Sequence, residues 1–259
     1  MNRGVLFIGH GTRRRHGMIE WLTFVRHVAA CLRPAGSSLL TCAFVEIEPP
    51  AIEDALRQLV AAGADEVVAV PLLLFAAGHM HTDIPRAFAA AENDLHGVPV
   101  RLLEPFGEEP EFVDVASLRI RQTLATWHIP PCNSAIVLIG RGNREFKAQQ
   151  AFAQVVRNVA QRFPRRRIET AYLAGTGRSL EQALDEMWTQ GVRTVAVVPF
   201  LWFSGWLTDT LPTRVETWAH AHPGVDIRIG SHLGGHSLLV KAVARRVQAY
   251  MQAKATPIR

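Results

Sequence analysis

The chain has 259 residues, of which 48% are hydrophobic and 20% are charged, so it holds enough apolar material for one large or two ordinary globular domains. No apolar run reaches the ~20 residues that a membrane span needs, and the run GVLFIG near the N-terminus is too short for a signal peptide. We therefore expect a cytoplasmic protein without a membrane partner.

The formal net charge is +5 and the isoelectric point is near 9.6, which favours an anionic partner. Basic residues are spread along the chain except for two arginine runs, at 13–15 and 165–167. With two tyrosines and no interleaving of aromatic and basic residues, the sequence lacks the pattern of nucleic-acid binding proteins. A polycarboxylated small molecule would satisfy the same excess of positive charge.

Three cysteines, Cys31, Cys42 and Cys132, are present, and no pair has CxxC spacing. An odd number in a chain of this size argues against a disulfide framework, a zinc knuckle and a cysteine-held iron–sulfur cluster. We expect reduced side chains.

The first half alternates strands with helices. We predict, in chain order, a strand at 4–9, a helix at 15–33, a strand at 39–45, a helix at 50–62, a strand at 66–72, a helix at 82–94, a strand at 98–103 and a helix at 110–127. Short all-apolar strands such as VVAVPLLL indicate a sheet covered on both faces. The alternation predicts an α/β fold with a doubly wound parallel sheet.

The second half repeats the first. Three pairs of blocks recur in the same order at nearly one offset: 5–13 with 136–144, 63–85 with 191–212, and 97–107 with 224–234. We infer a tandem duplication with homologous lobes at 1–128 and 133–259, joined by the proline-containing linker IPPCNS. Two such lobes predict a cleft between them, and ligands of these folds lie beyond the carboxyl ends of the strands.

Chemically reactive side chains follow three predicted strands of the first half. His10 lies between two glycines, Glu46 ends AFVE, and His79 lies in AAGHMHTDIP. Two imidazoles and a carboxylate suit a divalent metal such as Fe, Co, Ni or Zn. A metal site, an acid–base site and structural histidines all stay open at this point. His81 and Glu48 are the weaker alternatives to His79 and Glu46.

The second half lacks all three candidate ligands. The corresponding positions hold Arg141, Ala174 and Trp206. We therefore predict one lobe with a metal site and one that has lost it. Trp202, Phe203 and Trp206 are either an apolar wall for a large flat ligand or ordinary core packing.

His16 is a second histidine near the N-terminus, in the RHG triplet that histidine phosphatases carry. In those enzymes the reactive histidine directly follows the first strand, a position that His10 holds here. We interpret His16 as a residue on a helix surface. The stretch GHGTRR also lacks the third glycine of a dinucleotide-binding fingerprint.

The stretches LFIGHGTR, AFVE and VPLLLFAAGHMHTDIP resemble the class II tetrapyrrole chelatases over the whole chain. The likeness is to the long, two-lobed sirohydrochlorin cobaltochelatases and ferrochelatases. It implies a lyase that inserts Co²⁺ or Fe²⁺, or Ni²⁺, into sirohydrochlorin on the way to cobalamin or sirohaem, without an organic cofactor. It also implies that His10, Glu46 and His79 form the metal site and the catalytic site.

The carboxylates of such a tetrapyrrole would need cationic partners. Arg13 and Arg14, with Arg15, follow the first strand, and Arg141 and Arg144 hold related places in the other lobe, so these arginines either pair with the carboxylates or form a solvated charge run. Trp206 would face the macrocycle. A non-catalytic metal or tetrapyrrole carrier stays an alternative with the same site. Because both lobes are fused in one chain, we expect a monomer.

Overall fold

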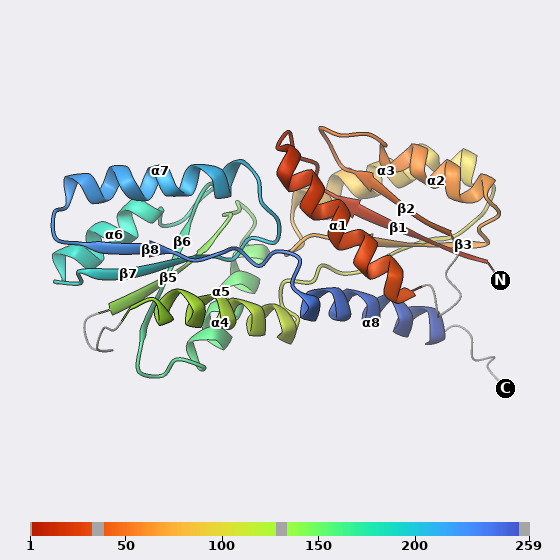
Figure 1. Cartoon of the computed structure of the whole chain (residues 1–259). Coiled ribbons are helices and arrows are strands. Elements are labelled where there is room, and N and C mark those ends of the chain that lie inside the picture. The colour runs from red at the N-terminus through yellow and green to blue at the C-terminus, as the bar shows by residue number, and fades with distance from the viewer. Residues whose placement is uncertain (1, 33–38, 128–133, 254–259) are drawn as a thin grey trace. The chain divides into compact units, whose positions relative to one another are not determined.

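The structure is a computed structural model that describes residues 2–32, 39–127 and 134–253. It divides into two compact units, 1–106 with 237–259 and 107–236 (Figure 1). Part of the predicted linker, 129–133 with Cys132, lies outside the described residues.

Unit 1 holds a four-stranded parallel sheet in the order β2-β1-β3-β4. Its elements are β1 (Arg3–Gly9), α1 (Arg15–Leu32), β2 (Leu39–Phe44), α2 (Ile52–Ala61), β3 (Glu66–Pro71), the π-helix η2 (His79–Asp83), α3 (Ile84–Ala91), the 3-10 helix η3 (Glu92–Leu95), β4 (Val100–Leu102) and α8 (Ser237–Ala253). The predicted doubly wound fold is confirmed, and each strand predicted in the first half lies within two residues of its expected position. The helix expected at 82–94 begins earlier, at His79, because a π-turn precedes α3.

The sheet of unit 1 is covered on both faces, as its apolar strands predict. On one face, Leu6 and Ile8 of β1 pack into a core with the buried residues of α2 and α3. Because side chains alternate along a strand, Val5 and Phe7 face the opposite side, where α1 and α8 lie (Figure 1). All four of these β1 side chains are fully buried. This rigid sheet fixes the positions of the loops at its carboxyl edge.

Unit 2 repeats this arrangement with the strand order β6-β5-β7-β8, again all parallel. Its elements are α4 (Pro110–Ala125), β5 (Ser134–Gly140), α5 (Phe146–Ala160), β6 (Arg167–Tyr172), α6 (Leu180–Thr189), β7 (Thr194–Pro199), α7 (Trp206–Ala221) and β8 (Asp226–Ile229). The helices α6 and α7 pack on one face of the sheet, and α4 and α5 lie on the other (Figure 1).

The compact units do not coincide with the sequence halves 1–128 and 133–259. The last helix of each half belongs to the other compact unit. The helix α4 of the first half packs within unit 2, and α8 of the second half packs within unit 1 against α1. In unit 1 the Tyr250 hydroxyl of α8 donates to Glu66 Oε1 at 3.0 Å, and Arg3 also pairs with Glu66. The sequence repeat therefore gives two similar sheets but not the boundary of the compact units.

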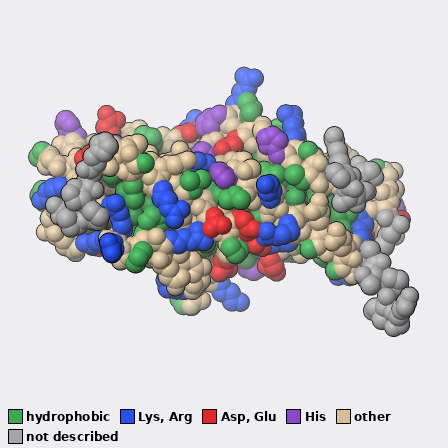
Figure 2. All heavy atoms as spheres, turned by 60° about the horizontal axis from the view of Figure 1, so that its bottom comes forward, with side chains coloured by type: hydrophobic (Ala, Val, Ile, Leu, Met, Phe, Trp, Pro, Cys, Tyr) green, Lys and Arg blue, Asp and Glu red, His purple; other side chains and the backbone are tan. Residues whose placement is uncertain are grey.

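The basic side chains do not form one dense patch on the face drawn in Figure 2. Lys and Arg side chains are dispersed there among acidic and apolar ones.

No described helix has the length and apolar character needed to span a bilayer. Of the cysteines, Cys31 and Cys42 are free thiols, and burial raises the pKa of Cys42.

Candidate metal centre

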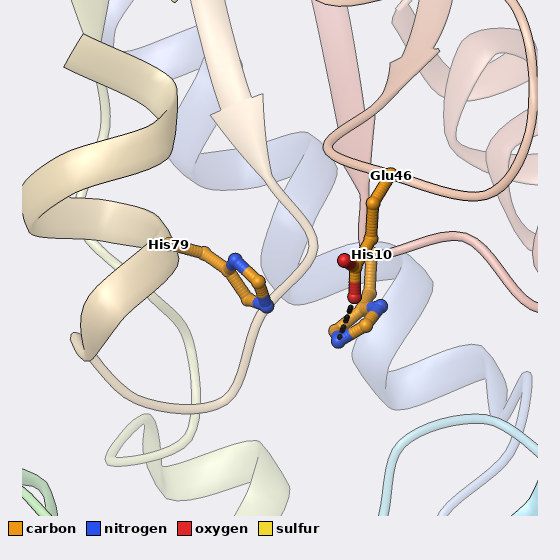
Figure 3. Close-up of side chains that lie close together, drawn as sticks. All are labelled: His10, Glu46 and His79. Atoms are coloured by element: carbon orange, nitrogen blue, oxygen red, sulfur yellow. Dashed lines mark ion pairs between the residues drawn. The ribbon is translucent and has the colours of Figure 1, made fainter. Parts of the chain in front are cut away.

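Three side chains from neighbouring strands of unit 1 meet at the carboxyl edge of the sheet. His10 follows β1, Glu46 lies just beyond β2, and His79 begins η2 after β3. One ligand atom from each lies within 4.8 Å of the others. Figure 3 shows the His79 ring directed toward His10 and Glu46. The sequence-predicted trio is therefore brought together, although these residues lie far apart in the chain.

The two imidazole rings and the carboxylate are in direct contact. His10 Nε2 lies 3.3 Å from Glu46 Oε1, the pair that Figure 3 marks with a dashed line. The rings of His10 and His79 stand nearly perpendicular, at 86°, with centroids 4.6 Å apart. The Glu46 side chain is 51% exposed, so the group is open to solvent on one side and an incoming ion has access.

The backbone ties His10 to Glu46. The Glu46 N–H donates to the His10 carbonyl at 3.2 Å, and the Val45 N–H donates to the Gly9 carbonyl at 2.9 Å. Gly11 has φ +94°, and a Cβ placed on it would overlap the Glu46 carbonyl oxygen. Only glycine allows the two loops to approach this closely. The glycine after His10 is thus part of how the site is built.

A hydrogen bond orients the His79 ring. Its Nδ1 lies 2.7 Å from Asp83 Oδ2, one helical turn further along η2. Because a carboxylate only accepts, Nδ1–H donates and the lone pair of Nε2 is left for a metal. Sequence reasoning missed Asp83. The i, i+4 spacing within HMHTD was a usable signal, but the predicted helix started too late to place both residues on it.

The alternative ligands stay outside the group. His81 is exposed on η2 and Glu48 is half-buried, and neither belongs to the metal-ligand group found among the described residues. His16 is exposed on α1, where the sequence predicts it. Arg13 and Arg14 are exposed in the segment between β1 and α1. Their proposed role with anions stays a prediction.

Unit 2 has the same backbone with different side chains. The Ala174 N–H donates to the Arg141 carbonyl at 2.8 Å, and the Leu173 N–H donates to the Gly140 carbonyl at 3.0 Å. These bonds match those of Glu46 and Val45, so the predicted correspondence of Arg141 with His10 and of Ala174 with Glu46 is confirmed. Within the described part of unit 2, no group of metal-ligating side chains takes this place.

The aromatic residues of unit 2 divide between core and surface. Trp202 is 4% exposed and stacks on Phe203 with ring centroids 5.2 Å apart. For Trp202, core packing is therefore the correct one of the two alternatives. Trp206 is the first residue of α7 and is 62% exposed. Phe203 is half-buried, so Trp206 is the most exposed of the three aromatics and offers the largest surface to a flat ligand.

Comparisons with known proteins point to one family. The family model CbiX matches residues 4–123 and again 135–250. The sirohydrochlorin cobaltochelatase of Priestia megaterium is 24% identical, over 95% of this chain and 79% of the relative. The sirohydrochlorin ferrochelatase of Bacillus subtilis (strain 168) is 25% identical, over 96% of this chain and 92% of the relative.

Solved structures show the same fold. The sirohydrochlorin chelatase SirB from Bacillus subtilis subspecies spizizenii, in complex with cobalt, superposes with a TM-score of 0.77 at 24% identity. That match covers 96% of this chain and 94% of the other. SirB from Bacillus subtilis with Fe³⁺ superposes with a TM-score of 0.78 at 24% identity, over 96% and 95% of the two chains.

Proposed function

Because this chain belongs to the CbiX family, whose model matches both of its repeats, we propose that it is a sirohydrochlorin chelatase. It is a lyase that inserts Co²⁺ or Fe²⁺ into sirohydrochlorin. Relatives that align over most of both chains carry the names sirohydrochlorin cobaltochelatase and sirohydrochlorin ferrochelatase. The metal ion is a substrate of this reaction, not a resident cofactor.

One observation carries the assignment to residues: the ligand atoms of His10, Glu46 and His79 lie within 4.8 Å of one another at a sheet edge. Two imidazoles and one carboxylate suit Fe²⁺ and Co²⁺. A chelatase must release its metal, so a site with three ligands and no thiolate serves it better than a closed structural site. The partial exposure of His10 and Glu46 leaves room for the ion to exchange ligands.

The site also offers acceptors for the protons that insertion displaces. As M²⁺ forms bonds to the macrocycle nitrogens, two pyrrole N–H protons must leave. We propose His10 first as a ligand and then, once the metal has left its ring nitrogen, as a base, with the Glu46 carboxylate 3.3 Å from its Nε2 to stabilise the imidazolium. Glu46 is a ligand or the second acceptor. His79, whose Nδ1 is held by Asp83, acts as a ligand only.

We further propose that Arg13 and Arg14 in unit 1, and Arg141 in unit 2, pair with carboxylates of sirohydrochlorin, and that Trp206 packs on its ring system. All four side chains are exposed, and arginine forms bidentate pairs with carboxylates.

Four further points stay predictions: the use of Ni²⁺, independence from organic cofactors, a monomeric state and a cytoplasmic location.

Turnover distinguishes the proposed enzyme from a carrier. Purified protein is mixed with an excess of sirohydrochlorin and of Co²⁺ or Fe²⁺, and the visible spectrum of the macrocycle is followed. A chelatase converts many equivalents of sirohydrochlorin per protein and exceeds the rate without protein. Conversion of one equivalent, followed by no further change, would indicate a metal or tetrapyrrole carrier.

A further inference from the structure

Ile47, the residue after Glu46, has a backbone conformation that isoleucine rarely adopts. Its φ is +73°, and the Glu48 N–H donates to the Glu46 carbonyl at 2.8 Å, which closes a three-residue turn around Ile47. A positive φ in such a turn is strained for a β-branched side chain. Among the described residues, the other non-glycine residue with positive φ is His96, which ends η3 at a position where this conformation is common.

The duplicated unit has a glycine at the same place. Gly175 follows Ala174 as Ile47 follows Glu46, and its φ is +75°. Glycine adopts this conformation without steric cost. The loop therefore needs a positive φ in both units, and unit 2 meets that need with the residue that fits. Unit 1 carries isoleucine in spite of the strain, so the side chain itself has to be accounted for.

The fold makes little use of the Ile47 side chain. It is 49% exposed and is not among the described residues packed against the core of α2 and α3. A single exposed isoleucine would be ordinary on any protein surface. An exposed isoleucine on a strained backbone is different, because neither packing nor chain geometry favours it there. Strain of this kind is typical of functional sites.

The position of Ile47 indicates what its side chain contacts. It directly follows Glu46, and its Cβ lies 3.4 Å from the point where a Cβ on Gly11 would stand, so it lies beside the loop that carries His10. We infer that Ile47 is a substrate-binding residue whose side chain packs against the flat carbon skeleton of the tetrapyrrole at the metal group. This inference rests on the proposed function and adds a binding contact to it.

The test compares Ile47→Gly with Ile47→Leu, using thermal unfolding and a fluorescence titration of metal-free protein with sirohydrochlorin. We expect Ile47→Gly to raise Tm by about 2–4 °C through relief of strain and to weaken sirohydrochlorin binding ~5- to 20-fold through the lost apolar contact. Ile47→Leu keeps an apolar side chain and should bind within ~3-fold of wild type. Gly175→Ala, which places a side chain on the equivalent backbone, should lower Tm.

Three results for Ile47→Gly would overturn the inference. A Tm below that of wild type would show that the side chain is structural. Unchanged sirohydrochlorin binding, or a Co²⁺ affinity that falls together with the sirohydrochlorin affinity, would show that Ile47 does not contact the tetrapyrrole or that it only supports Glu46. In the absence of tetrapyrrole, we expect Ile47→Gly to bind Co²⁺ with an affinity within ~2-fold of wild type. The titration needs no turnover. If wild-type protein binds sirohydrochlorin without inserting metal, the proposed function is contradicted. The comparison of sirohydrochlorin affinity between wild type and the Ile47 variants can still be made in that case.

Discussion

Gly11 shows how a residue without a side chain shapes the metal group. The loop after β1 passes so close to the loop after β2 that a Cβ on Gly11 would overlap the Glu46 carbonyl oxygen. Gly142 has the same relation to the Ala174 carbonyl in unit 2. The duplication thus supplies a matched pair of glycines, one beside the proposed ligands and one where those ligands are absent.

We predict that Gly11→Ala and Gly142→Ala both lower the free energy of unfolding, by about 2–4 kcal/mol, because each adds a clash and a strained φ. Only Gly11→Ala should also weaken Co²⁺ binding, by at least ~10-fold, since it displaces Glu46. Urea unfolding and a Co²⁺ titration of folded protein measure the two effects. Equal Co²⁺ affinity of both variants would contradict the role of Gly11 in the site.

Asp83 is the residue that fixes the ring of His79. We predict that Asp83→Ala weakens Co²⁺ binding ~10- to 100-fold, because the ring loses the partner of its Nδ1–H. Asp83→Asn should show a smaller loss, since the amide oxygen still accepts that proton without the charge. Asp54→Ala is the control: this carboxylate pairs with Arg57 on the surface of α2. A Co²⁺ affinity of Asp83→Ala equal to that of Asp54→Ala would count against the prediction.

Among the elements, α6 and α7 of unit 2 are joined by an ion pair. Arg214 of α7 donates to both carboxylate oxygens of Glu181 on α6, each at 2.7 Å, and to the Leu173 carbonyl at 2.9 Å. The hydrogen bonds from Arg214 lower the pKa of Glu181 from 4.5 to about 2. A lowered pKa in the folded state stabilises the fold above the unfolded pKa, and this contribution is lost as pH falls.

We therefore predict that Glu181→Gln lowers the free energy of unfolding by about 1 kcal/mol at pH 7, a value reduced by solvent because the side chain is partly exposed. The difference from wild type should shrink as pH falls from 4.5 toward 2, because wild-type Glu181 then takes up its proton. Urea unfolding at a series of pH values checks this. A difference that stays constant down to pH 2 would contradict it.

The elements themselves are largely readable from the sequence, and the exceptions have physical reasons. The apolar runs of β1 and β3 end at glycine and proline, which fixes the ends of these two strands and the edge of the sheet beyond which His10 and His79 lie. The early start of the helix at His79 was missed because a π-turn has no clear apolar period. The turn at Ile47 was also missed, since the following Glu48 and two prolines look like entry into a helix.

For the whole molecule, the exchange of α4 and α8 is the feature that sequence patterns could not give. Each of these helices is the last element of its repeat and has one buried apolar face. Periodicity alone does not tell which sheet that face covers. In unit 1, α8 buries Leu239, Val243 and Val247. The homologous halves 1–128 and 133–259 stay our proposal for the ancestry of the chain, whereas the compact units are set by packing.

We predict that a fragment of residues 1–128 does not form a stable folded monomer, because it lacks α8 and leaves α4 without its partners in unit 2. Adding the separately produced fragment 133–259 should restore cooperative unfolding and Co²⁺ binding. Circular dichroism and light scattering after gel filtration measure folding and mass. A monomeric 1–128 fragment with a cooperative thermal transition would show that α8 is dispensable for unit 1.

We propose that the group of His10, Glu46 and His79 inserts the metal. The most direct measurement is the initial rate of Co²⁺ insertion into sirohydrochlorin, followed by the visible spectrum, for wild type and for the double variant His10→Ala/His79→Ala. We predict at least a ~100-fold lower rate for the double variant, because metal binding and proton acceptance fail together. His16→Ala, which removes an exposed histidine of α1, should keep the wild-type rate. A double variant as fast as wild type would contradict the assignment of metal insertion to these residues.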